Sequence, residues 1–411
     1  MATWQQTPLA ADAYSRLMAM GFDEANYIGC PTGFLSWFGR PGFGETKFSP
    51  VASVVDIEIR RANQRTAALA PRGMISTPLG GALPATSLTR HSAFSRRFPL
   101  SIEEGSISAD QLEFRLMGEA AYQPADHLTR VRSLVLSHHK EQVRRTVRLH
   151  EVLAAQSILT GFQDAILGAA AAGDTDHIYD FVRLATHTFV APGGTWTAPA
   201  APAIGDMETG CDLIRTDASV TPDFVLLGRT AMDNLTANTQ VLALAASRRA
   251  NFIGLGAGDS VISNPMPTKF QRFVDGGWIY RGYLETPSGY HLSIFTYLDT
   301  YVNAAGVVTP YMPLNDVLLG SSEAICDRYF GPPERLPLSP SEEADMKFFM
   351  GVDPAGGMMP PKIKGAADVI TPAMFSFDFY KSGRKTFTVE TQSAPLFVPT
   401  MTDAWVTIDA T

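Results

Sequence analysis

Residues 126–160, DHLTRVRSLVLSHHKEQVRRTVRLHEVLAAQSILT, contain neither proline nor glycine and are rich in leucine, arginine, alanine, glutamine and glutamate. Such a composition predicts a single helix of roughly 50 Å. Asp126 is suited to cap its start and Gly161 to end it. Apolar residues recur three or four positions apart and would form one stripe along this rod. The sequence therefore predicts a long helix that packs on one side.

The remaining surface of the predicted rod is basic. Its cations are Arg130, Arg132, Lys140, Arg144, Arg145 and Arg148, and the acids among them are Asp126, Glu141 and Glu151. The whole chain has a formal net charge of −8, so any contact with nucleic acid must be local. Two interpretations remain open: a solvated helix face, or a face that contacts a polyanion.

The segment before the rod divides into an arm, a strand and a basic excursion. Residues 1–50 are interrupted by glycine and proline and carry Phe34, Trp37 and Phe38, which must pack on a neighbouring subunit or on the body of the same chain. Residues 51–59 alternate at their end and predict a strand. Residues 60–97 contain seven arginines, no lysine and no acid, and several prolines and glycines. They predict a long basic loop, followed by the acids Glu103 and Glu104 and a helix beginning near Gln111.

After the rod, the pattern predicts a compact α/β region and a β-rich ending. A strand is expected at 178–190, a loop at 193–202, a buried strand at 222–228 and a helix at 231–249. Antiparallel strands are expected at 271–274, 278–284 and 290–301, and further strands at 374–380, 386–392 and 404–408.

The sequence carries no strong catalytic or metal motif. GxxxxGK[ST], HExxH and GxSxG are absent, and Gly254–Gly258 lacks the spacing of a dinucleotide site and predicts a loop. His138 and His139 are adjacent, so on a helix they cannot share one metal ion. Cys30, Cys211 and Cys326 lie far apart, which predicts buried thiols in a reducing compartment and no disulfide. No cofactor, metal, signal peptide or membrane span is expected.

An ordered set of short segments resembles one family. These segments are Val54–Glu58 leading to Leu69–Gly73, Pro222–Gly228 before a helix, Tyr297–Tyr301 with Gly306, Tyr311–Pro313, Val317–Leu319, Tyr329–Pro332 and Ser393–Pro399 ending in Asp403 and Ala404. In this order they resemble the major capsid protein E family of lambda-like tailed phages, which has the Hong Kong 97 type capsid fold. The segments span most of the chain from about residue 50.

The resemblance implies an α+β subunit with an N-terminal arm, an extended loop, a peripheral domain with a long spine helix, and an axial domain. Carried onto this sequence, the arm is 1–50, the extended loop 51–105, the peripheral domain 106–204 with its spine helix at 126–160, the axial domain about 205–320, and a return to the peripheral domain 321–411. The implied function is structural: hexamers and pentamers of the chain self-assemble into an icosahedral shell around double-stranded DNA.

The same resemblance implies a set of partners and places. Scaffolding protein, portal and a decoration protein would join the shell, the final location would be the virion capsid, and assembly would take place in the host cytoplasm. No catalytic residue, cofactor or membrane is implied.

Charge suggests which residues make the contacts. A basic loop cannot bury enough of its own surface, so it needs acids on a neighbouring subunit. We expect Arg60, Arg61, Arg96 and Arg97 to pair there with Glu103, Glu104 or Asp110. Arg144, Arg145 and Arg148 are expected to face packaged DNA without reading its bases.

Two alternatives belong to other classes of protein. One is a non-viral compartment shell of the same fold, which a docking surface for cargo would distinguish. The other is a soluble enzyme of unrecognised family that uses Cys211 or His291, which would form a small oligomer and lose activity when those residues are replaced.

Overall fold

The structure is a computed structural model that describes residues 30–48, 54–60, 91–97, 101–108, 127–164, 178–192, 194–247, 250–252, 266–303, 306–331, 375–381 and 386–411. The predicted helix near Gln111 and the predicted loop at Gly254–Gly258 lie outside these ranges, as does most of the basic excursion. Among the described helices, none has the length and apolar character needed to cross a bilayer.

The long helix is present. α3 (His127–Leu159) has 33 residues, which at 1.5 Å per residue is about 50 Å. The chain leaves it through Gly161, whose φ of 76° lies in the left-handed region and closes the helix as expected. Residues 150–155 are all buried, so this part of α3 is surrounded, whereas Arg144 and Arg145 one to two turns earlier are exposed. The single apolar stripe predicted for the rod therefore widens to all faces near its C-terminal end.

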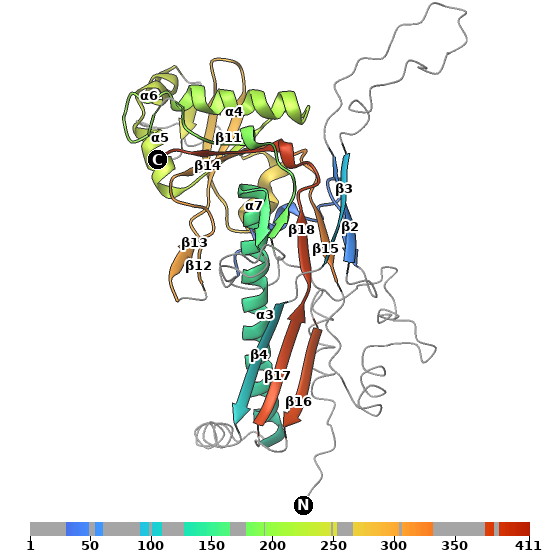
Figure 1. The fold of residues 1–411 in the computed structure, drawn as a ribbon. Coiled ribbons are helices and arrows are strands. Elements are labelled where there is room, and N and C mark those ends of the chain that lie inside the picture. The colour runs from blue at the N-terminus through green and yellow to red at the C-terminus, as the bar shows by residue number, and fades with distance from the viewer. Residues whose placement is uncertain are drawn as a thin grey trace, which may run out of the picture.

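A long antiparallel sheet runs beside the N-terminal part of α3 (Figure 1). It has the order β16-β17-β4, from β16 (Phe375–Lys381), β17 (Thr386–Ser393) and β4 (Ser101–Ser108). β17 is the central strand, with Phe387 opposite Ile107 and Tyr380 opposite Phe387. Segments from both ends of the chain thus share the sheet that lines the rod.

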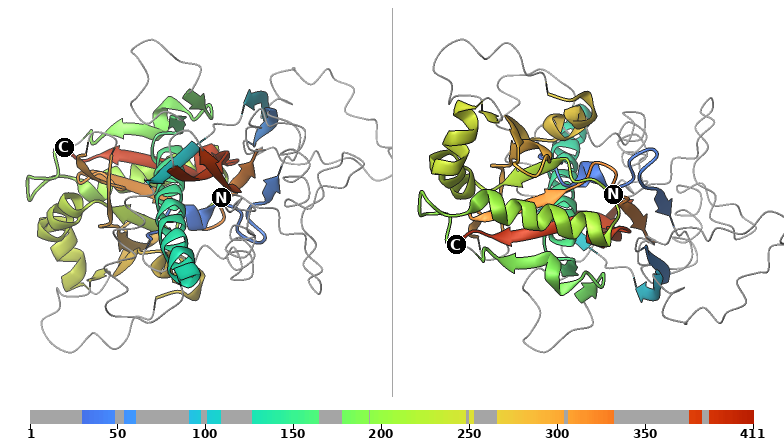
Figure 2. Two further views of the ribbon diagram at one scale, coloured as in Figure 1. Left: turned by 90° about the horizontal axis from the view of Figure 1, so that it is seen from below. Right: turned by 90° about the horizontal axis from the view of Figure 1, so that it is seen from above.

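A mixed seven-stranded sheet forms the second body of the subunit. Its order is β7 (Thr188–Val190), β19 (Trp405–Asp409), β14 (Asp316–Gly320), β8 (Phe224–Leu227), β11 (His291–Thr296), β10 (Ile279–Glu285) and β9 (Ala250–Phe252). β8 is fully buried, as its unbroken apolar run predicts, because both faces of the sheet are covered. α4 (Ala203–Asp217) lies across one face (Figure 2).

Close packing of α4 on the sheet depends on Gly210. A Cβ at this position would lie 2.3 Å from Leu319 Cδ1, so only glycine lets the helix approach β14 this closely. The sheet uses β7 and β19, which both lie outside 205–320, so the unit it defines is wider than that range.

Several small sheets complete the fold. β2 (Val54–Arg60) pairs with β3 (His91–Arg97), and β5 (Phe162–Asp164) pairs with β6 (Ile178–Asp180). β1 (Thr46–Phe48), β15 (Asp327–Phe330) and β18 (Pro395–Val398) form a three-stranded sheet. β12 (Thr300–Val302) and β13 (Val308–Pro310) form a projecting hairpin. The strands predicted near 54–59, 279–284, 375–380, 386–392 and 405–408 are confirmed.

The strand predicted at 290–301 is divided into β11 and β12, and three further sequence-based element assignments were wrong. The predicted helix 231–249 is two helices, α5 (Arg229–Ala237) and α6 (Thr239–Ala246), because the Asn238 side chain accepts from the Gln240 and Val241 amides and starts a new helix. The predicted strand 271–274 is helical: α7 (Gln271–Asp275) follows the 3-10 turn η6 (Thr268–Phe270), and the two elements bury Phe270 and Phe273 at helical spacing.

The third concerns residues 178–190. Val182 has a φ of 55° and breaks the run, so β6 and β7 are separate strands with the 3-10 turn η4 (Ala185–His187) between them. The bend brings Arg183 to the end of α3, where it donates to Ile158 O at 3.0 Å and Leu159 O at 2.8 Å. Arg183 thus caps the carbonyl groups at the end of α3, and the chain forms two short strands in place of one continuous strand.

Candidate functional site

The arm is anchored in the core of its own chain. η2 (Leu35–Trp37) is a short 3-10 turn, and Phe34, Trp37 and Phe38 around it are completely buried. Trp37 stacks on Phe273 with ring centroids 4.0 Å apart, and it also packs against Phe224 and Trp405. Of the two expected locations for these aromatic residues, the body of the same chain is the one observed.

Glu151 of α3 holds this turn in place. Its Oε1 accepts from Phe34 N at 2.7 Å and from Tyr297 Oη at 2.8 Å, and its Oε2 accepts from Leu35 N at 2.8 Å. One carboxylate therefore joins the arm, the spine helix and the segment after β11. The sequence analysis missed this role and counted Glu151 as a surface acid among the arginines of the rod.

The pKa of Glu151 is raised to about 8, because complete burial penalises the charged form more than the three donors favour it. The pKa of the Tyr297 hydroxyl is also raised, chiefly because burial penalises its charged form and further because the Glu151 carboxyl lies beside it. A titratable group that affects the position of the arm is thus enclosed at the joint of three elements.

The next residue of α3 also reaches a distant strand. His150 Nε2 lies 2.9 Å from Ser393 Oγ at the end of β17, and both side chains are buried. Burial lowers the pKa of His150 to about 3, so the ring is neutral. α3 therefore fixes the arm on one side and the long sheet on the other through adjacent residues.

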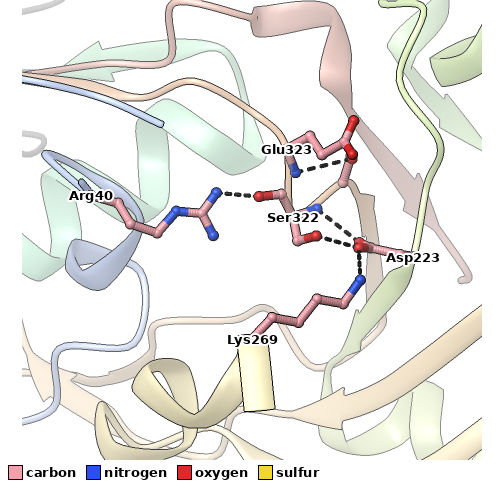
Figure 3. Close-up of polar contacts among 6 residues, drawn as sticks. Arg40, Asp223, Lys269, Ser322 and Glu323 are labelled. Atoms are coloured by element: carbon pink, nitrogen blue, oxygen red, sulfur yellow. Dashed lines mark hydrogen bonds and ion pairs between the residues drawn. The ribbon is translucent and has the colours of Figure 1, made fainter. Parts of the chain in front are cut away.

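A second polar cluster fastens the arm to the seven-stranded sheet (Figure 3). Arg40 donates to the carbonyl of Ser322, and its guanidinium lies 4.1 Å from the centre of the Phe43 ring. Asp223 accepts from the amide and the hydroxyl of Ser322 and from Lys269 Nζ. The arm then continues as β1, which pairs in parallel with β15. These contacts join the arm to the segments that border β8, β14 and α7.

The three candidate DNA-facing arginines lie together. Glu141 is within 3.9 Å of Arg144, 3.7 Å of Arg145 and 3.5 Å of Arg148, so the three guanidinium groups share this carboxylate. Arg144 and Arg145 are exposed and Arg148 is half-buried. The structure therefore gives α3 a compact basic face, immediately before the buried stretch that carries Glu151.

The candidate interface residues lie on two different sheets. Arg96 and Arg97 stand opposite Val55 and Val54 in the β2–β3 ribbon, whose other strand ends at Arg60. Glu103 and Glu104 are on β4, opposite Thr391 and Glu390. Arg61 and Asp110 lie outside the described residues.

The described residues give no support for a metal site or for catalysis by cysteine or histidine. No group of three histidines, cysteines, aspartates or glutamates there could hold a metal ion. Cys211 and Cys326 are buried, and burial raises the pKa of both thiols. His187 contacts Asp217 and the Trp405 carbonyl, not a cysteine, and His291 is exposed on β11. The expectation of buried thiols is met by Cys211 and Cys326, whereas Cys30 is only partly buried.

A rod helix beside a long sheet, a separate mixed sheet and an arm define a class of protein: the subunit of a shell with the Hong Kong 97 type capsid fold. A solved protein of a prophage from Escherichia coli CFT073, described as a capsid protein, is similar to this chain with a TM-score of 0.59 at 12% identity, over 98% of this chain and 99% of that one.

Residues 54–349 match the phage major capsid protein E family, and the chain belongs to that family. It is a major capsid protein of a phage, a structural component of an icosahedral shell and not an enzyme. The resemblance inferred from the sequence is confirmed.

Two solved phage capsids are similar at lower scores. The mature capsid of bacteriophage PhiM1 gives a TM-score of 0.40 at 9% identity, over 89% of this chain and 85% of that one. The capsid of cyanophage P-SCSP1u gives 0.39 at 11% identity, over 90% and 86%. No curated protein sequence matches the chain.

Proposed function

We propose that the shell is built from hexamers and pentamers of this chain and encloses phage double-stranded DNA. The observation that supports this proposal is the family match over residues 54–349, in a chain whose spine helix carries an exposed basic face. Identical subunits close a shell through repeated heterologous contacts around symmetry axes.

Expression alone and with a neighbouring scaffolding gene, followed by negative-stain electron microscopy and sedimentation, tests this assembly route. We expect closed shells, or hexamers and pentamers that convert into them. A small oligomer of another symmetry from both preparations would overturn the proposal.

We also propose which residues form each domain of the subunit. Residues 1–50 serve as the arm, 51–105 as the extended loop with the β2–β3 ribbon as its stem, and 106–204 with 321–411 as the peripheral domain around α3. The axial domain is centred on 205–320. We assign β7 and β19 to it as well, since both are strands of its seven-stranded sheet.

The extended loop is proposed to be held by ion pairs between subunits. Arg60, Arg61, Arg96 and Arg97 would face Glu103, Glu104 or Asp110 of a neighbour. The positions of β3 and β4 support these ion pairs. β3 carries Arg96 and Arg97, β4 carries Glu103 and Glu104, and the two strands belong to separate sheets, so the basic and acidic residues lie on different parts of the subunit.

Charge reversal tests the ion pairs. Arg96→Glu combined with Arg97→Glu should block shell assembly and leave the subunit folded by circular dichroism, because like charges would meet at every copy of the contact. Arg229→Glu, at an exposed position of α5, is the control and should assemble normally. Normal shells from the double variant would refute these pairs.

Further partners follow from the same proposal. A scaffolding protein and a portal would act during assembly in the host cytoplasm, and a decoration protein could cement the finished shell. With no lysine in residues 60–97, a covalent crosslink from a loop lysine is excluded, so noncovalent contacts must stabilise that region.

A further inference from the structure

The β12–β13 hairpin presents an uncharged surface to solvent. Its strands pair Val302 with Val308 and Tyr301 with Thr309, and the hairpin extends beside α3 away from the seven-stranded sheet (Figure 1). Tyr301 faces inward, with its ring 5.1 Å from that of Tyr311. Val302 and Val308 face outward with 65% and 63% of their surface exposed. An isolated two-stranded ribbon with an apolar outer face is marginal in water, so it requires a covering partner.

The sequence of this hairpin is unusual for a solvent-facing loop. No charged residue occurs between Asp299 and Asp316, in a chain that is 18% charged. Five of the twelve exposed large hydrophobic side chains among the described residues fall between 298 and 314. Edge ribbons that face water normally carry charges that prevent association with other chains. The absence of charge here indicates that association is the role of this surface.

A complementary surface exists on the same subunit. A hollow of about 620 Å³ lies between the end of α3, residues 183–188 and the inner side of the hairpin, lined by Leu159, Phe162, Leu184 and Pro313 among others. Phe162, which lines the hollow, is a further exposed large hydrophobic residue, and Ile178, Val182 and Val190 lie in residues 178–190, whose middle part also lines it. Nine of the twelve exposed large hydrophobic residues among the described residues therefore lie in residues 162–164, 178–190, 298–303 and 306–314, and parts of each of these stretches line the hollow.

We propose that the outer face of the β12–β13 hairpin of one subunit docks against the hollow of a second copy of this chain, on the side formed by residues 162–164 and 178–190. Both surfaces are apolar, they lie on different elements of one subunit, and a head-to-tail contact of this kind covers both and repeats around a ring. An isologous contact would leave one of the two surfaces in water. This inference rests on the proposed assembly through hexamers and pentamers and names the surface that forms them.

Charge insertion provides the first test. Val302→Asp combined with Val308→Asp should lower the yield of hexamers, pentamers and shells about tenfold or more, because docking would bury unpaired carboxylates. Leu242→Asp, at an exposed apolar position on α6 outside both surfaces, is the matched control and should assemble normally. The melting temperature of the unassembled subunit should stay unchanged in all variants.

Two outcomes of that test would overturn the proposal. One is normal assembly of the Val302→Asp, Val308→Asp variant. The other is a lowered melting temperature of the unassembled variant, which would mean that the hairpin is covered by its own chain.

Crosslinking of mixed particles provides the second test. Subunits with Val302→Cys and subunits with Phe162→Cys, carrying different tags, are assembled together and treated with a short bismaleimide. Both subunits also carry Cys30→Ser, because Cys30 is only partly buried, whereas Cys211 and Cys326 are buried. Each subunit then has one accessible thiol, the introduced one, so a mixed dimer reports contact between subunits. We expect mixed dimers in assembled particles and none in dissociated subunits.

Dimers of Val302→Cys with itself would indicate a two-fold contact between hairpins and overturn the docking proposed here. Assembled particles without mixed dimers would also overturn it. Absence of shells from the unmodified chain would instead count against the proposed assembly route, so the two failures are distinguishable.

Discussion

At the scale of single residues, Glu151 shows how a buried carboxyl group can link three elements. Its two oxygens accept three hydrogen bonds, from Phe34, Leu35 and Tyr297. The donors favour the carboxylate, whereas burial favours the protonated acid. Burial is the larger effect, so the pKa of Glu151 rises to about 8. The strength of the arm joint should therefore depend on pH.

The pKa of Glu151 predicts the direction of that dependence. Its folded pKa of about 8 exceeds its ordinary value of 4.5, so between these values the folded state holds a proton that the unfolded state lacks. The stability linked to this proton is complete below about pH 4.5 and is lost as pH rises through 8. Denaturant titrations should show Glu151→Gln with a flatter decline of unfolding free energy between pH 6 and 8, by roughly 1 kcal/mol per pH unit.

A matched control lies on the same helix. Glu141 is only partly buried, and Glu141→Gln is the reference for removal of a carboxyl group that lies outside the arm joint. Equal slopes for Glu151→Gln and the unmodified chain would show that the proton is bound elsewhere.

At the scale of elements, α3 changes character along its length. Around Arg144 one face of the helix is exposed and basic, and from His150 to Ala155 the helix is buried on every side. The part of α3 around Arg144 can therefore contact a ligand, whereas the part from His150 to Ala155, one to two turns later, holds the subunit together.

The basic part of α3 leads to a prediction about DNA. If Arg144 and Arg148 contact phosphates, Arg144→Gln with Arg148→Gln should reduce the salt slope of DNA binding by dissociated capsid subunits by up to about two, since each neutralised phosphate contributes roughly 0.9. Filled particles of this variant should also release DNA at lower temperature. The comparison variant is Arg229→Gln on α5. An unchanged slope and unchanged particle stability at every salt concentration would show that this face does not contact DNA.

The elements differ in how far the sequence alone could predict them. α3, β8 and the β16–β17 pair follow from local periodicity, and their placement agrees with the expectation. α7 was mistaken for a strand because a short aromatic and β-branched run fits either structure. The three-residue spacing of Phe270 and Phe273 was the available signal.

The site was harder to predict than the elements. Glu151 contacts Phe34, Leu35 and Tyr297, which are more than a hundred positions away in sequence, so no local pattern encodes the joint. Arg183 likewise interrupts a predicted strand only because the end of α3 lies beside it. Long-range partners of this kind become visible only when the chain is folded.

At the scale of the whole molecule, the arm is an internal part of the subunit. Trp37 lies among Phe224, Phe273, Trp278 and Trp405, which come from three separate segments of the chain. The aromatic rings of the arm therefore cover the face of the seven-stranded sheet opposite α4.

Truncation of this indole should destabilise the subunit. We expect Trp37→Ala to lower the unfolding free energy by about 3–5 kcal/mol, because it leaves a large cavity between the arm and the sheet. Phe43→Ala, at a position that is 36% exposed, should cost about 1 kcal/mol or less. Urea unfolding of both variants measures the difference, and equal losses would contradict an anchoring role for Trp37.

The position of β19 has a consequence for the timing of synthesis. This strand, Trp405–Asp409, lies inside the seven-stranded sheet between β7 and β14, whose residues leave the ribosome earlier. At translation speeds of about 5–20 residues per second, β14 waits roughly 4–20 s for its neighbour. During that interval the hydrogen bonds between β14 and β19 cannot form, and Trp405 has not yet reached Trp37. A nascent capsid subunit is thus kept incomplete at its centre until synthesis has passed residue 409.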